Sequence, residues 1–201
     1  MRLKRFTIWA VAAAMCGIVS DARATLITFD DLPATVTTEV PAATASGFAA
    51  VRTGALMSLQ FIVDGVTVTV SREGGAQFDL VDNVSLVSQQ GKSASFGSRS
   101  LDPFFDTSPS AFIFSFNTPI KIFSILAGDW GGYDTEIMAL SGHNSSDGSG
   151  PAVETDQKNM LIGTSNVFSS KRFEISHNAG FSSVKFVSNG LRPGFQPTGM
   201  S

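Results

Sequence analysis

Apolar and polar side chains alternate along several short stretches of this chain, and the alternation predicts β-strands. The clearest stretch is residues 61–70, in which valine alternates with threonine after the dipeptide Asp64-Gly65. That dipeptide favours a tight type I′ turn, so the stretch predicts a hairpin. Residues 112–116 place three phenylalanines on one face, which predicts a strand with a buried aromatic side.

Turn-forming Gly, Asn, Asp and Pro residues separate further stretches of strand length. The predicted strands are residues 25–29, 61–63, 66–70, 76–81, 84–87, 112–116, 120–127, 135–140, 168–176 and 182–188. We expect 120–127 to be buried on both faces, because its side chains are mostly apolar. Residues 34–47, 128–134 and 141–159 predict loops, and residues 48–60 predict a loop with short strands.

These strands indicate an all-β domain, folded as an antiparallel β-sandwich of jelly-roll type. No repeat of fixed length occurs, which argues against a parallel β-helix. No linker divides the chain, so residues 25–201 are expected to form a single domain.

The first 24 residues have the features of a cleavable signal peptide. Arg2, Lys4 and Arg5 precede an apolar run at residues 6–19, and Ala-Arg-Ala at 22–24 fits the cleavage pattern. The apolar run is shorter than the roughly 20 residues that cross a bilayer core. We therefore expect an exported protein with no stable membrane insertion after cleavage. An uncleaved anchor is one alternative to this interpretation.

The other alternative is a lipoprotein whose mature chain starts at Cys16, although Met15 is large where a lipoprotein carries a small residue. Cleavage after residue 24 removes this single cysteine, so the exported domain would contain no disulfide. It also leaves 10 Lys and Arg against 16 Asp and Glu, a net charge of −6. Nucleic acid and anionic membranes require basic patches, so neither is expected as a partner.

Residues 129–136 combine acidic and aromatic side chains in one Gly-rich segment. Asp129, Asp134 and Glu136 supply three carboxylates, separated by two glycines that allow a tight backbone. Calcium takes about six to eight oxygens from carboxylates and carbonyls, so these residues are candidate ligands, although the spacing is not that of an EF-hand. The alternative is a solvated acidic hairpin turn.

Trp130 and Tyr133 are the only Trp and Tyr after residue 24. Each combines an aromatic ring with a polar tip, which suits a half-exposed surface that stacks against sugars. Both lie beside acids that can bond sugar hydroxyls, so we predict that they bind glycan. The alternative is that Trp130 packs inside the domain.

Five short stretches form a pattern that spans most of the chain after residue 24. They are Leu-Ile-Thr-Phe-Asp-Asp-Leu-Pro at 26–33, Ser-Leu-Asp-Pro-Phe-Phe at 100–105, Phe-Ser-Phe-Asn-Thr-Pro-Ile at 114–120, Gly-Asp-Trp-Gly-Gly-Tyr-Asp-Thr-Glu at 128–136 and Phe-Ser-Ser-Val-Lys-Phe at 181–186. In this order they resemble the PEP-CTERM (exosortase-sorted) extracellular proteins of bacteria. The resemblance implies a carbohydrate-binding-module-like sandwich with a matrix or surface role. It also implies a structural calcium where the first and last strands meet, for which Asp30 and Asp31 are candidates.

The chain departs from that family at its C-terminus. The family's Pro-Glu-Pro motif, membrane helix and basic tail are absent, and the sequence stops at residues 197–201, where such domains run on into a final strand. We therefore expect a version of the domain that lacks its last strand, or a truncated chain. A missing strand would leave an unpaired sheet edge.

Catalytic motifs are not evident. Neither G-x-S-x-G nor H-E-x-x-H occurs. His143 and His177 are predicted to be ordinary surface histidines, the alternative being a triad with Ser and Asp. Zinc is not expected without Cys or a close His pair. Glu136, Glu154 and Glu174 are available to a glycosidase, but nothing in the sequence pairs them.

The sequence therefore predicts a secreted, non-catalytic binding or matrix module that is stabilised by calcium and binds extracellular polysaccharide weakly. Its expected location is extracellular or at the cell surface, with the periplasm as an alternative. One rival function is a secreted polysaccharide hydrolase, which needs two carboxyl groups roughly 5–10 Å apart in a cleft. The other is a purely structural surface protein.

Overall fold

The protein is built of antiparallel β-sheets. The computed structural model describes residues 29–30, 32–35, 39–41, 48–50, 56–85, 96–103, 111–131, 137–159 and 167–188. Regular structure in these ranges is almost entirely strand, which confirms the all-β prediction. In the same ranges no helix is both long and apolar enough to span a membrane. The predicted signal peptide and residues 25–28 lie outside the described residues.

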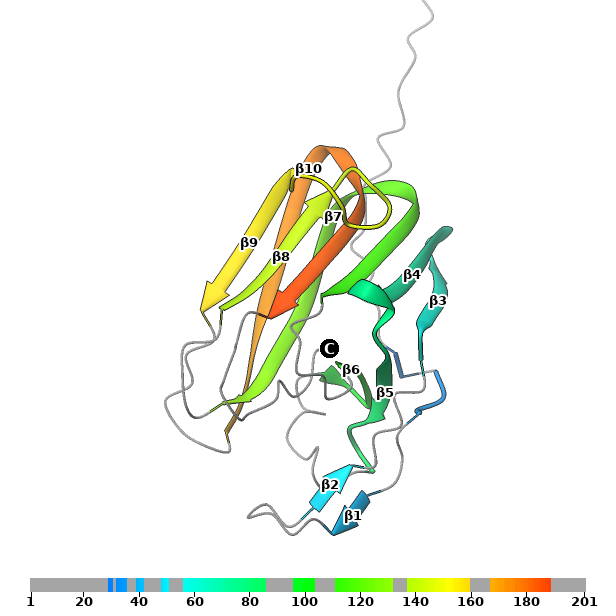
Figure 1. Cartoon of the computed structure of the whole chain (residues 1–201), viewed down its shortest axis with the longest axis vertical. Helices are drawn as coiled ribbons and strands as arrows, with labels where there is room; N and C mark the ends of the chain where they lie inside the picture. Colours follow the sequence, from blue (N-terminus) through cyan, green and yellow to red (C-terminus); the bar gives the residue numbers. More distant parts are fainter. Residues whose placement is uncertain are drawn as a thin grey trace, which may run out of the picture.

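The strands of the described residues fall into three sheets (Figure 1). In chain order the elements are β1 (Glu39–Pro41), β2 (Phe48–Ala50), β3 (Ser58–Val63), β4 (Val66–Arg72), the 3-10 turn η1 (Glu73–Gly75), β5 (Phe78–Asp82), β6 (Arg99–Pro103), β7 (Phe112–Gly131), β8 (Ile137–His143), β9 (Glu154–Asn159) and β10 (Val167–Ser188). β1 pairs with β2, and β5 with β6. The third sheet has six strands in the order β3-β4-β7-β10-β8-β9.

The predicted hairpin at residues 61–70 is confirmed. β3 and β4 pair through Val63 opposite Val66, with Asp64 and Gly65 between them. Asp64 has φ of 49° and Gly65 has φ of 79°. Positive φ at both central residues is what a type I′ turn requires, so local turn chemistry is sufficient to define this hairpin.

β7 and β10 pair along most of their length and form a two-stranded ribbon. The register runs from Val167 opposite Gly131 to Phe186 opposite Phe112, with irregular pairing near Phe181 and Ile120. β4 flanks the ribbon beside the N-terminal part of β7, and β8 flanks it beside the C-terminal part of β10.

This ribbon folds over on itself, so that its two halves face each other. The rings of Phe114 and Phe123 lie on the same strand with centroids 5.2 Å apart, whereas nine residues of straight strand would span about 30 Å. The rings of Phe173 and Phe186, both on β10, are also 5.2 Å apart. Figure 1 shows β7 and β10 both turning over at the same end.

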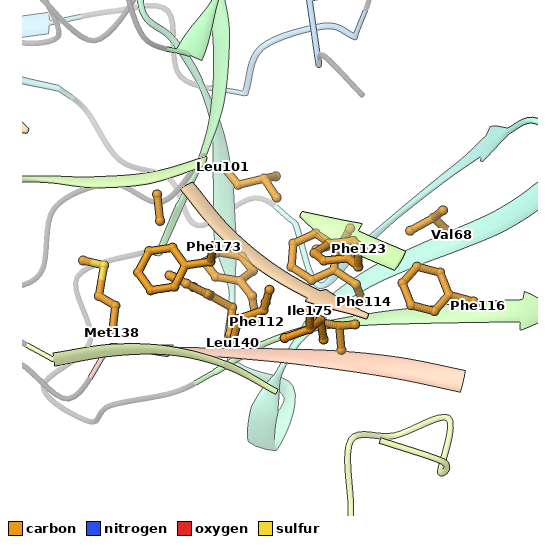
Figure 2. Close-up of a cluster of buried hydrophobic side chains, with 14 of the residues drawn as sticks. Val68, Leu101, Phe112, Phe114, Phe116, Phe123, Met138, Leu140, Phe173 and Ile175 are labelled. Atoms are coloured by element: carbon orange, nitrogen blue, oxygen red, sulfur yellow. The ribbon is translucent and has the colours of Figure 1, made fainter. Parts of the chain in front are cut away.

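Phenylalanine fills the space between the two halves (Figure 2). Phe112, Phe114 and Phe116 are all buried on one side of β7, which confirms the predicted aromatic face. Their rings meet neighbours in tilted or edge-on arrangements, the preferred geometry of aromatic pairs. The buried cluster comprises Phe29, Val68, Val70, Phe78, Leu80, Leu101, Phe112, Phe114, Phe116, Phe123, Ala127, Met138, Leu140, Phe173, Ile175, Phe181, Val184 and Phe186.

Several segments predicted as loops are strands. Residues 39–41 form β1, residues 128–131 continue β7, residues 141–143 continue β8, and residues 154–159 form β9. The loop predictions were wrong at these positions. Residues 128–131 and 141–143 pair with the distant β10, and β1 and β9 pair with the neighbouring strands β2 and β8, although their side chains show no strand pattern.

Two strand predictions also need correction. Residues 120–127 are not buried on both faces, since Phe123 and Ala127 are buried while Ile122 is 52% exposed. Val84 lies in a turn rather than in a strand at 84–87. Its N–H, like that of Ser85, is held by the Asp82 carboxylate, which competes with strand pairing.

Candidate functional site

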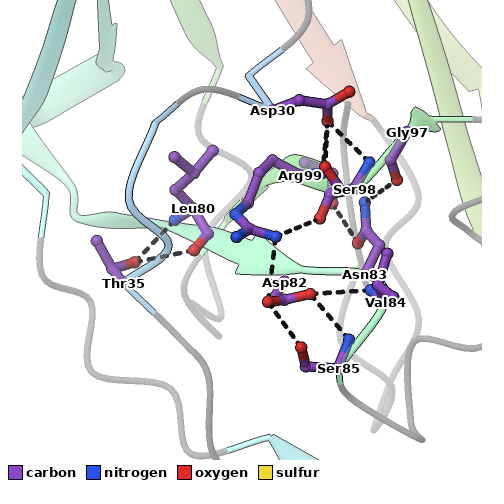
Figure 3. A network of polar contacts seen from close by, with 11 residues as sticks. Asp30, Thr35, Leu80, Asp82, Asn83, Val84, Ser85, Gly97, Ser98 and Arg99 are labelled. Atoms are coloured by element: carbon purple, nitrogen blue, oxygen red, sulfur yellow. Dashed lines mark hydrogen bonds and ion pairs between the residues drawn. The ribbon is translucent and has the colours of Figure 1, made fainter.

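The structure places Asp30, one of the predicted metal ligands, against the turn that precedes β6 (Figure 3). Its Oδ1 accepts hydrogen bonds from the Ser98 N–H at 2.8 Å, the Ser98 hydroxyl at 2.7 Å and the Arg99 N–H at 3.1 Å. Gly97 allows this approach, because a Cβ there would lie 3.0 Å from the Asp30 carboxylate. Asp30 therefore joins the N-terminal segment to β6.

A second carboxylate organises the other side of the same turn. Asp82 accepts hydrogen bonds from Val84, from the N–H and hydroxyl of Ser85, and pairs with Arg99 at 3.1 Å. Burial alone would raise the pKa of Asp82, but the bonds from Ser85 and Val84 and the charge of Arg99 lower it overall. The carboxylate is thus held ionised at the end of β5.

Further polar contacts extend this network along β5 and β6. The Ser100 hydroxyl donates to Asn83 Oδ1 at 2.9 Å. The Thr35 hydroxyl lies 3.1 Å from the Asp79 carboxylate and accepts the Leu80 N–H at 2.8 Å. Three segments far apart in sequence are therefore joined by hydrogen bonds between polar side chains and backbone. The arrangement is that of a structural network.

Asp129 and Trp130 lie at the C-terminal end of β7, opposite Ser169 and Phe168 of β10. β10 also separates β7 from β8 in the sheet. The strands on either side of residues 132–136 are therefore not paired as a hairpin. β7 ends and β10 begins at one end of the ribbon, whereas β8 begins beside the C-terminal end of β10, where β9 ends.

Most of the predicted ligand set lies outside the described residues or is described by its backbone alone. Asp31, Tyr133, Asp134 and Glu136 lie outside the described residues, and Asp129 and Trp130 are placed by their backbone pairing alone. Within the described ranges, no three His, Cys, Asp or Glu side chains are grouped so as to hold a metal ion. The calcium site at 129–136 stays a prediction.

The structure also brings together a buried cluster that the sequence did not predict. His143 Nε2 lies 2.9 Å from the Ser141 hydroxyl, and His143 is buried rather than at the surface. Burial, assisted by the charge of Lys185, lowers the pKa of His143, against the opposing effects of the Gly150 backbone and Asp147. Alternation along β8 could have placed Ser141 and His143 on one face.

A loop covers this cluster on the outer face of the sheet. The Ser183 hydroxyl donates to the Ser145 carbonyl at 2.6 Å, and the Ser115 hydroxyl donates to the Ser146 carbonyl at 2.5 Å. The Val153 N–H donates to the Gly142 carbonyl at 2.9 Å where the chain enters β9. Residues 144–153 are therefore held down on the sheet and bury His143.

Comparison with known proteins yields no matching family model, no matching curated protein and no matching solved structure.

Proposed function

We propose that this protein is an exported, non-catalytic binding module of an extracellular matrix or cell surface. In this proposal it is a jelly-roll sandwich of the PEP-CTERM type that its sequence resembles, it binds calcium structurally, and it holds extracellular polysaccharide weakly. The antiparallel, all-β architecture and the folded β7–β10 ribbon support a sandwich.

The observation that carries the proposal is the position of Asp129 and Trp130. Both lie on paired backbone at the end of β7, and the chain continues directly into the segment with Tyr133, Asp134 and Glu136. A ligand site attached to a regular strand is held more precisely than one on an isolated loop. The end of the ribbon is therefore the best-supported place for a calcium and glycan site.

The polar clusters of the described residues support a non-catalytic role. Asp30 and Asp82 use their carboxylates to fix the turns around β6, and the Ser141–His143 pair lies under residues 144–153. Each cluster holds loops against a sheet, which is the function expected of a binding scaffold.

Calcium binding is tested by isothermal titration of the secreted protein. We expect a single saturable binding heat. Asp129→Asn should lower the calcium affinity at least tenfold, because calcium loses a charged oxygen ligand. Asp147→Asn is the matched control, since Asp147 lies beyond the opposite end of β8. The proposal fails if calcium produces no heat, or if both variants lose affinity equally.

Glycan binding is tested on an array of acidic and neutral polysaccharides. We expect weak signals that Trp130→Ala abolishes and Trp130→Phe partly retains, because an aromatic ring at this position stacks on the sugar. Signals that are equal in the wild type and in Trp130→Ala would place glycan binding elsewhere. The absence of any signal would leave a purely structural surface protein as the better description.

A further inference from the structure

The six-stranded sheet of the described residues ends in β3 on one side and β9 on the other (Figure 1). These two edges differ in the side chains that they carry. An edge strand presents unpaired backbone N–H and C=O groups, which can pair with another chain. Charged side chains on the edge oppose such pairing. The two edges can therefore be compared by the charges that they carry.

The β9 edge is charged and linked to the other half of the ribbon. Asp156 accepts the Glu174 N–H of β10 at 2.8 Å and pairs with Lys158. The Lys158 ammonium also lies 5.0 Å from the ring centroid of Phe173. Glu154 adds a further charge at the start of the strand. These side chains disfavour the addition of another strand at β9.

The β3 edge has the opposite character. Ser58–Val63 contains no charged residue and alternates between exposed and half-buried positions. Ile62 is 72% exposed, more than any other large hydrophobic side chain in the described ranges. Within those ranges β4 is the only strand that pairs with β3. This edge lacks the charge that protects β9.

The hairpin register shows which backbone groups face outward. In a two-residue hairpin the residues that flank the turn exchange both hydrogen bonds, and hydrogen-bonded pairs then alternate with non-bonded pairs. Val63 pairs with Val66, so Phe61 and Leu59 also bond to β4. Ser58, Gln60 and Ile62 therefore direct their N–H and C=O groups to the free edge.

We propose that β3 pairs antiparallel with β3 of a second copy of this chain, about a two-fold axis at Gln60. In this register Gln60 faces Gln60 of the other copy, and Ser58 faces Ile62. All three outward-facing residues of each strand are then used, giving about six backbone hydrogen bonds. Leu59 of one copy lies beside Phe61 of the other on the core-facing side, so the pairing is self-complementary on both faces.

The second copy fits this edge because no like charges meet. The nearest charge is Asp64, which lies one residue beyond the strand. In the proposed register the two copies of Asp64 are eight residues apart along the joined strands, or about 27 Å. That distance exceeds the Debye length of roughly 8 Å at physiological ionic strength, so their repulsion is screened. A single pair of edge strands buries less surface than a standard protein–protein interface, so self-association is expected to be weak.

A charge swap at the two-fold axis tests the proposal. Sedimentation velocity of the secreted protein over about 10 µM to 1 mM should show a concentration-dependent dimer. Gln60→Lys places two ammonium groups face to face and should weaken dimerisation about tenfold or more, and Gln60→Glu should do the same with two carboxylates. An equimolar mixture of the two variants should restore the dimer, because opposite charges then face each other.

Gln157→Lys is the matched control, since Gln157 is an exposed glutamine on the β9 edge. It should dimerise as the wild type does. A wild type that is monomeric at every concentration overturns the proposal, and so does a dimer that persists in Gln60→Lys. Loss of the dimer in Gln157→Lys, or failure of the mixed variants to restore it, also overturns the β3 register. Circular dichroism of each variant confirms that it is folded.

Discussion

Gly180 is subject to two constraints where the ribbon folds over. Its φ is +80°, a conformation that other residues rarely adopt. A Cβ at this position would lie 3.1 Å from the Ile120 carbonyl oxygen and 3.2 Å from the Pro119 Cβ. One residue thus permits both the turn of β10 and its close contact with the turn of β7.

Gly180→Ala is therefore expected to lower the free energy of unfolding by about 2–4 kcal/mol, from backbone strain and overpacking together. Gly150→Ala is the matched control, because Gly150 has φ of +79° but nothing within 4 Å of the added Cβ. It should cost about 1 kcal/mol, from strain alone. Urea denaturation of both variants measures the difference, and equal costs would contradict the tight contact at the bend.

His143 should make stability sensitive to mild acid. Its pKa is lowered in the folded protein from an ordinary value of 6.5, chiefly by burial. The unfolded chain then binds a proton at higher pH than the folded chain does. The contribution of His143 to stability is therefore fully present above about pH 6.5 and is lost as pH falls towards the folded pKa. The charge of Lys185 lowers the pKa of His143 further and that of Asp147 raises it, and the Lys185 ammonium donates a hydrogen bond to Glu73 at 2.6 Å.

Urea denaturation between about pH 8 and pH 5 measures this dependence in a range where Asp and Glu side chains are ionised. His143→Gln should flatten the profile, because no imidazole is then buried. His177→Gln should keep the wild-type profile, since the burial of His143 is unchanged. A profile that His143→Gln leaves unaltered would show that the ring is not the titrating group.

At the scale of elements, the folded ribbon makes a prediction about two residues of one strand. Phe114→Leu and Phe123→Leu should show a coupling energy of about 0.5–1.5 kcal/mol in a double-mutant cycle, because their rings are in contact. Phe114→Leu with Ile122→Ala is the control pair, and its coupling should be near zero, since Ile122 points outward. Equal coupling in both pairs would argue for a straight β7.

The difference between predicted and observed elements follows from the range of the interactions. The hairpin at 61–70 was predictable because Asp64 and Gly65 determine its turn locally. The strand character of 128–131 was not, because Gly128 and Asp129 form a strand only through pairing with β10. The folding over of the ribbon depends on phenylalanines that meet across it, a contact that no local pattern reveals.

For the candidate site, too, some features were predictable from the sequence and others were not. The carboxylates and aromatic residues of 129–136 were evident from the sequence. Strand pairing shows in addition that Asp129 and Trp130 lie at the end of β7. The burial of His143 was missed, because it depends on how residues 144–153 fold over the sheet. Residue type was therefore readable from sequence, whereas burial required the tertiary arrangement.

At the scale of the whole molecule, the proposed ligand site lies at one end of the folded β7–β10 ribbon. The Phe core and the networks around Asp30 and Asp82 stabilise the scaffold, and β7 ends with Asp129, Trp130 and Gly131. Calcium is then expected to bind at this end of the ribbon without changing the sheets.

Trp130 offers the most direct test, because it is the only tryptophan after residue 24 and its fluorescence reports on this site alone. Titration of the protein with calcium should change the emission saturably, with a midpoint of about 0.1–1 mM that is typical of extracellular modules. EDTA should reverse the change, and Asp129→Asn should abolish it. Emission that is unaltered by calcium, or altered equally in Asp129→Asn, would contradict a calcium site at the end of the ribbon.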